Sequence, residues 1–128
     1  MALFYSGDPI SLACSNIAAA KQFWIEIFGC SEDKGASYWD DALPSDIALK
    51  LPGEDDAVLG LFDKAEAEQA GLGRASARSL IFCSDIAKAH SYLAVRGLQP
   101  GEIGALGGMQ FFEIQDWEGN TVEICMEE

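Results

Sequence analysis

The chain is poor in basic residues. Its 128 residues include 8 Lys and Arg against 21 Asp and Glu, which gives a net charge of −13. Phosphate-rich partners are bound by basic patches, so this balance argues against nucleic acid and anionic membranes as partners. It favours cationic ligands if the acids line a cleft. For most of the acids, a solubilising surface is the competing explanation.

Long apolar runs and a basic N-terminal stretch are also lacking. No apolar run reaches the roughly 20 residues that a membrane helix needs. Residues 1–8 include Asp8 and no basic group, unlike a secretory signal. The four cysteines have no metal-type spacing, and three of them fall in predicted strands, where a free thiol packs as a small apolar side chain. We therefore expect a cytoplasmic protein with reduced thiols, although the sequence leaves disulfides open.

A strand–turn–helix stretch occurs twice in the chain. Segments 14–24 and 83–93 share Cys, Ser, Ile and two Ala at matching positions, which is typical of an internal repeat. In each copy, alternating apolar residues lead into Asn or Asp, whose side chain caps a helix by accepting a free backbone N–H. Each predicted helix then meets a glycine suited to its C-terminal end. The alternative is that any two strand–helix units look this similar.

Each half of the chain is predicted to form a strand, a helix and three more strands. The predicted strands cover 10–15, 36–41, 47–51, 57–62, 78–84, 102–106, 109–115 and 121–126, and the predicted helices cover 17–28, 64–69 and 86–96. The expected fold class is α+β, in a single domain 1–128 with modules at about 1–62 and 78–128 and a linker at 63–77. Each module is too small to fold alone, so the two must share a core.

The most specific motif lies near the end of the chain. Segment 116–124 reads Asp-Trp-Glu-Gly-Asn-Thr-Val-Glu-Ile. Together with the two βαβββ modules, it resembles the closing Asp-x-x-Gly-Asn-x-x-Glu pattern of the vicinal oxygen chelate superfamily. That group contains glyoxalase I, extradiol dioxygenases and bleomycin-resistance proteins. The resemblance covers nearly the whole chain and implies curved mixed sheets around a cleft, in chains that commonly pair as homodimers.

The same resemblance implies metal ligands on the first and last strands of each module. These positions hold Pro9, Gly60, Arg78 and Glu123. Only Glu123 offers a ligand, because Pro and Gly have no side-chain donor atom and Arg has no lone pair. The single histidine, His90, is predicted on the surface of a helix. One ligand falls short of the three expected of a catalytic site, so we expect no metal, no cofactor, and an Arg78–Glu123 ion pair instead.

Strand alternation predicts the side chains that line the cleft, because residues two apart share a face. The predicted set is apolar and aromatic with a few polar groups, which is typical of a small-molecule site. It consists of Ser11, Ala13, Val58, Phe62, Arg78, Leu80, Phe82, Thr121 and Glu123, bordered by Tyr38 and Trp39. Ordinary packing at the sheet edge is the alternative role for the last two aromatics.

The sequence is compatible with three functions. The first is a metal-free small-molecule-binding protein of the bleomycin-resistance type, which sequesters a bulky, flat, cationic ligand by stacking and cation–π contact. The second is a lyase, isomerase or dioxygenase that works through Glu123 as a metal ligand or acid–base group. The third is a subunit whose cleft is filled by its own side chains. The missing metal ligands favour the first.

Overall fold

The computed structural model describes residues 3–6, 10–35, 39–57, 59–74, 79–116 and 118–127. Within these ranges the chain forms two βαβββ modules in succession, with a short helix between them. In chain order the elements are β1 (Phe4–Ser6), β2 (Ile10–Cys14), α1 (Ile17–Phe28), β3 (Ser31–Glu32), β4 (Ile47–Lys50), β5 (Leu59–Asp63), α2 (Lys64–Gln69), β6 (Ser79–Cys83), α3 (Ile86–Val95), β7 (Gly104–Leu106), β8 (Met109–Gln115) and β9 (Thr121–Glu127). None of the helices in these ranges is long and apolar enough to span a membrane.

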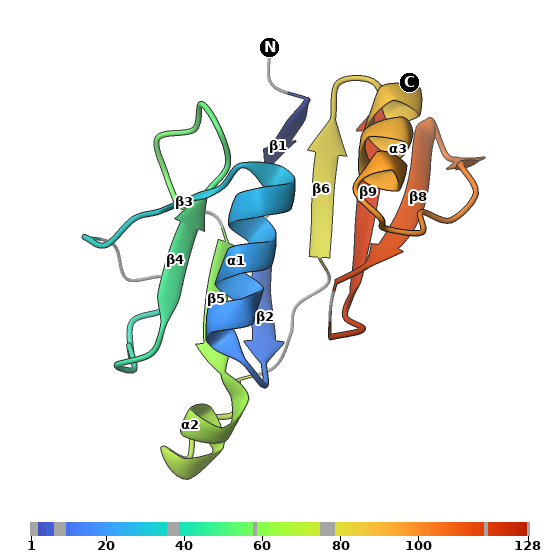
Figure 1. Ribbon diagram of the computed structural model, residues 1–128. Helices are drawn as coiled ribbons and strands as arrows, with labels where there is room; N and C mark the ends of the chain where they lie inside the picture. Colours follow the sequence, from blue (N-terminus) through green and yellow to red (C-terminus); the bar gives the residue numbers. More distant parts are fainter. Residues whose placement is uncertain are drawn as a thin grey trace.

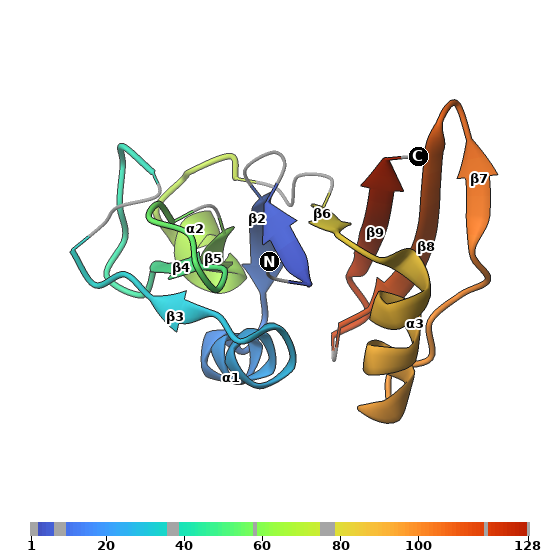
Figure 2. The same ribbon diagram turned by 90° about the horizontal axis from the view of Figure 1, so that it is seen from above.

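The strands form two mixed sheets that lie side by side (Figure 1). The first sheet has the order β2-β5-β4-β3, and the second has the order β1-β6-β9-β8-β7. In each module the first and last strands are parallel neighbours, β2 with β5 and β6 with β9. Helices α1 and α3 lie on the same side of the two sheets (Figure 2). The predicted α+β class with mixed sheets is therefore confirmed.

The helices begin and end at the residues that the sequence indicates. The side chains of Asn16 and Asp85 each accept a backbone N–H at 3.1 Å in the first turns of α1 and α3. Asp63 does the same for α2 at 3.0 Å. Gly29 ends α1 with a φ of 71°, a left-handed conformation that glycine adopts without steric cost. These caps are local interactions, which is why the predicted helix positions are confirmed.

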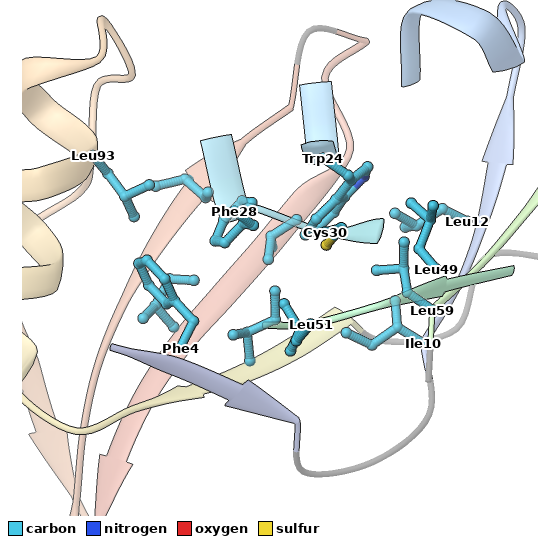
Figure 3. Close-up of a cluster of buried hydrophobic side chains, with 14 of the residues drawn as sticks. Phe4, Ile10, Leu12, Trp24, Phe28, Cys30, Leu49, Leu51, Leu59 and Leu93 are labelled. Atoms are coloured by element: carbon cyan, nitrogen blue, oxygen red, sulfur yellow. The ribbon is translucent and has the colours of Figure 1, made fainter. Parts of the chain in front are cut away.

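One hydrophobic cluster joins the two modules (Figure 3). Trp24 of α1 is fully buried and stacks on Phe28 with ring centroids 4.7 Å apart. Phe4 of β1 packs edge-on against both Phe28, at 4.9 Å, and Tyr92 of α3, at 5.6 Å. Leu93 of α3 belongs to the same cluster. The two modules thus share a core, as their small size predicts.

Two strands differ from the sequence prediction. β1 was not predicted, and it pairs antiparallel with β6 at the edge of the second sheet. β3 was not predicted either; each of these strands is too short to show an alternating pattern. A strand predicted over 36–41 is wrong for residues 39–41, which form a bend and turn, while 36–38 lie outside the described residues. Two contacts with other segments stabilise the turn: the Trp39 ring packs against Phe62, and the Asp41 carbonyl accepts a hydrogen bond from Arg74.

The buried thiols are weak acids. Cys14, Cys30 and Cys83 are free thiols and at most 4% exposed. Burial raises the pKa of Cys14 and of Cys30 to about 12 and the pKa of Cys83 to about 11. For Cys14, the nearby carboxylate of Glu118 adds to the effect.

We expect the free energy of unfolding to fall as the pH rises above about 9. Thiols in the unfolded chain ionise near that pH, whereas the folded state keeps them protonated up to a pH of 11 to 12. Between its two pKa values Cys30 alone contributes a loss of about 1.4 kcal/mol per pH unit. Urea unfolding of the wild type and Cys30→Ala at several pH values between about 8 and 11 measures this loss. Equal pH slopes for the two proteins would contradict the account.

Candidate functional site

An aromatic row crosses the second sheet on the face away from α3. In strand register, Tyr5 lies opposite Phe82, Phe82 opposite Cys125, and Cys125 opposite Phe111. The Tyr5 and Phe82 rings stack at 5.8 Å with 19° between their planes. Phe111 extends the row over β7, where a side chain on Gly104 would come within 3.3 Å of its ring. Phe112 and Ile114 of β8 belong to the hydrophobic cluster, so alternation puts Phe111 and the rest of the row on the opposite face.

Two carboxylates lie beside the aromatic row. Glu113 of β8 is directly opposite Glu123 of β9, which is in turn opposite Leu80 of β6. Glu113 is exposed, whereas Glu123 is partly buried and accepts a hydrogen bond from the Cys125 thiol at 3.1 Å. Like charges opposite each other destabilise a sheet.

The corresponding face of the first sheet is covered by the protein's own side chains. Ser11 and Ala13 of β2 are half-buried and lie opposite Gly60 and Phe62 of β5. The ring of Trp39 packs edge-on against Phe62, with centroids 5.6 Å apart and 90° between the planes. Phe62 is consequently only 1% exposed. It lies on the face that alternation indicates but is not open to solvent.

Arg74 covers the ring of Trp39 and also lies near Phe62. Its guanidinium carbon lies 4.1 Å from the Trp39 ring centroid and 5.7 Å from that of Phe62. Nη1 donates to an Asp46 carboxylate oxygen at 2.7 Å, and Nη2 donates to the Asp41 carbonyl oxygen at 2.6 Å. The hydrogen bond with Asp46 raises the pKa of Arg74 above its ordinary value. The Arg74 side chain is 6% exposed, so it acts as a buried cation on this face.

A cavity of about 340 Å³ lies beside Arg74, at the carboxyl ends of β2 and β5. Residues of both modules surround it, together with residues of α2. Its lining consists of Ala13, Phe62, Lys64, Ala67, Glu68, Leu72, Arg74, Glu118 and Asn120. The structure thus brings two of the predicted site residues, Ala13 and Phe62, together at one hollow.

The Asp-x-x-Gly-Asn motif fastens the two modules to each other at this cavity. Asp116 is 8% exposed, and its Oδ1 accepts the backbone N–H groups of Glu118 at 2.9 Å and Asn120 at 2.8 Å. The Glu118 carboxylate accepts the Ser15 backbone N–H at 2.7 Å, and the Asn120 amide donates to the Ala13 carbonyl at 3.4 Å. The motif therefore has a structural role in the described residues, because it holds the last turn against β2.

Of the remaining predicted site residues, Ser11 and Trp39 belong to the first module, and the others are spread over the second sheet or lie outside the described residues. Leu80, Phe82 and Glu123 share the face that carries the aromatic row, and Thr121 is exposed at its end. The predicted site did not include Tyr5, Phe111, Glu113 or Arg74. Pro9, Tyr38, Val58 and Arg78 lie outside the described residues, so the Arg78–Glu123 ion pair stays a prediction.

The described ranges contain no group of three or more His, Cys, Asp or Glu side chains that could hold a metal ion. His90, predicted on the surface of a helix, is half-buried on α3. Its Nε2 lies 2.9 Å from the Gly101 carbonyl oxygen, and its ring packs edge-on against Phe112 at 5.0 Å. His90 therefore belongs to the packing between α3 and the second sheet.

Solved structures of the glyoxalase/bleomycin resistance protein/dioxygenase superfamily share this fold. TnmS3, an antibiotic-binding protein from Streptomyces sp. CB03234, aligns with a TM-score of 0.70 and 18% identity over 97% of this chain and 98% of that one. A superfamily member from Sphaerobacter thermophilus DSM 20745 aligns at 0.69 and 16% over 96% and 98%. Lactoylglutathione lyase from Agrobacterium tumefaciens aligns at 0.69 and 19% over 94% and 92%.

No family profile and no curated protein matches the sequence. The likeness to solved structures confirms the fold that the sequence resemblance implies. Proteins with this fold include both an antibiotic binder and a lyase, so the fold alone does not separate binding from catalysis.

Proposed function

We propose that the protein is a metal-free small-molecule-binding protein that holds a flat aromatic cation on the face of the second sheet away from α3. The observation that carries this proposal is the aromatic row of Tyr5, Phe82 and Phe111 beside the opposed carboxylates Glu113 and Glu123. Aromatic faces attract cations and stack on flat ligands. The net charge of −13 also raises the local concentration of cations.

The residues at the superfamily's metal positions support a metal-free mode of binding. Pro9, Gly60 and Arg78 provide no side-chain lone pair, which leaves Glu123 as one ligand where a catalytic site uses three. Sequestration needs no metal and no acid–base group. The antibiotic-binding protein TnmS3, which shares the fold, supports this proposal by analogy.

Proflavine, a planar aromatic cation, is expected to bind the wild type more tightly than anthracene carboxylate, a planar anion of similar size. Glu113→Gln is expected to weaken proflavine binding roughly tenfold, which corresponds to about 1.4 kcal/mol for a lost charge contact. The same change should leave the melting temperature of the unliganded protein equal or slightly higher, because it removes one of two opposed charges. Fluorescence titration and thermal unfolding provide the two measurements.

The matched control is Asp55→Asn, which removes one exposed carboxylate from a turn of the first module. If the loss of affinity reflects net charge alone, the two variants will bind proflavine equally. Equal affinities, or equal binding of the planar anion by the wild type, would overturn the proposal.

We also expect the working unit to be a homodimer, because open, partly apolar sheets tend to pair across a two-fold axis. Large apolar side chains at the outer edge of the second sheet support this expectation: Ile103 is 41% exposed and Leu106 of β7 is 77% exposed. Light scattering at micromolar concentration should give twice the 13.8 kDa mass of the chain. A stable monomer under these conditions would contradict it.

A further inference from the structure

We infer that Trp39, Phe62, Asp41 and Asp46 form a second binding site, for a guanidinium cation, and that Arg74 of the same chain occupies it as an internal ligand. This guanidinium cage belongs to the first module and does not depend on the aromatic row of the second. The ligand class that fits is a small molecule with a guanidinium or alkylguanidinium group.

The aromatic part of the cage presents two rings to one cation. Trp39 and Phe62 are perpendicular, with 90° between their planes. The guanidinium carbon of Arg74 lies 4.1 Å from one centroid and 5.7 Å from the other, and both distances fall within the range of about 6 Å for cation–π attraction. A planar, weakly hydrated guanidinium suits such a stacked position better than an ammonium does.

The acidic part of the cage holds its orientation without Arg74. One carboxylate oxygen of Asp46 binds Arg74, while the other accepts the Leu43 backbone N–H at 2.8 Å. The backbone N–H of Asp46 in turn donates to the Leu43 carbonyl at 3.0 Å. Because this turn fixes Asp46, whose side chain is only 10% exposed, the carboxylate stays aimed into the cage when Arg74 leaves.

Arg74 fits the cage incompletely. Its Nε is buried and has no hydrogen-bond partner among the described residues. A buried N–H without an acceptor is costly, so this side chain is held less tightly than a fully bonded guanidinium would be. The cavity of about 340 Å³ beside Arg74 offers room for the remainder of a larger ligand.

Arg74 competes with any external guanidinium for the cage. Arg74 is tethered through the backbone, so an external ligand binds only in the fraction of molecules whose Arg74 has swung out. The apparent dissociation constant is the intrinsic constant divided by that fraction. Removing the Arg74 side chain should therefore uncover a site that is masked in the wild type.

The test is calorimetric titration of Arg74→Ala with methylguanidinium. We expect a dissociation constant lower than that of the wild type by roughly tenfold or more, because the internal competitor is gone. N-methylurea, a neutral molecule of nearly the same shape, should not bind. The double variant Arg74→Ala/Asp46→Asn should lose the binding, whereas Arg74→Ala/Asp55→Asn, which removes a carboxylate elsewhere, should keep it.

If Arg74→Ala is unfolded on its own, the measurement becomes the fraction folded by circular dichroism. Methylguanidinium should then restore the folded state at concentrations where N-methylurea does not. Two results would overturn the inference: equal responses of Arg74→Ala to the two probes, or equal binding by the variant with Asp46→Asn. Neither result bears on proflavine binding at Glu113, so the two proposals fail separately.

Discussion

Asp46→Asn is expected to destabilise the fold by about 3–5 kcal/mol, because it leaves the buried guanidinium of Arg74 without its main counter-ion. The two side chains are 6% and 10% exposed and are joined at 2.7 Å. Arg74 also covers Trp39, so loss of the pair disturbs the packing of the first sheet. Urea unfolding at neutral pH gives the free energies. The double variant Arg74→Met/Asp46→Asn should recover much of the loss, since no charge is then stranded.

The control for this prediction is Asp41→Asn. The Asp41 carboxylate lies 3.6 Å from Arg74 but is 61% exposed, so its loss should cost less than about 1 kcal/mol. Equal costs for Asp41→Asn and Asp46→Asn would mean that solvent exposure does not set the strength of these pairs here. That result would contradict the prediction that the buried Arg74–Asp46 ion pair stabilises the fold more than the exposed Asp41 carboxylate does.

Trp24→Ala is also expected to cost about 3–5 kcal/mol, because it removes the largest fully buried side chain of the shared core. Trp24 stacks on Phe28 at 4.7 Å and meets Phe23 edge-on at 5.6 Å, so its loss leaves a cavity between α1 and the first sheet. Urea unfolding measures the cost. Val95→Ala, at a position 83% exposed on α3, should change stability by less than about 0.5 kcal/mol. Equal stabilities of the two variants would contradict the assignment of this core.

Local signals in the sequence predict the helices well. Asn16 and Asp85 are followed by apolar residues at helical spacing, and each caps the helix that begins after it. These interactions span three residues, so no knowledge of the tertiary structure is required. β1 and β3 were missed for the opposite reason: their pairing partners, rather than any pattern of their own, make them strands.

The candidate site was only partly predictable. Glu113 could have been found, because the turn at 116–120 pairs Gln115 with Thr121, and counting back along β8 then puts Glu113 opposite Glu123. Arg74 could not, because it lies in the linker and meets Trp39 and Asp46 only through the tertiary fold. No local pattern marks such a contact.

The alternative of a cleft filled by the protein's own side chains describes the first sheet, where Trp39 and Arg74 cover Phe62. It does not describe the second sheet, where Tyr5 is 39% exposed and Glu113 is open to solvent. The two modules therefore share a fold but differ in what their sheet faces offer a ligand.

Metal-free binding of an aromatic cation is tested most directly by calorimetric titration of the wild type with proflavine before and after exhaustive treatment with a chelator. We expect one bound proflavine per chain with the same dissociation constant in both preparations. Binding that is lost on chelation and restored by an equivalent of zinc, nickel or manganese would contradict it.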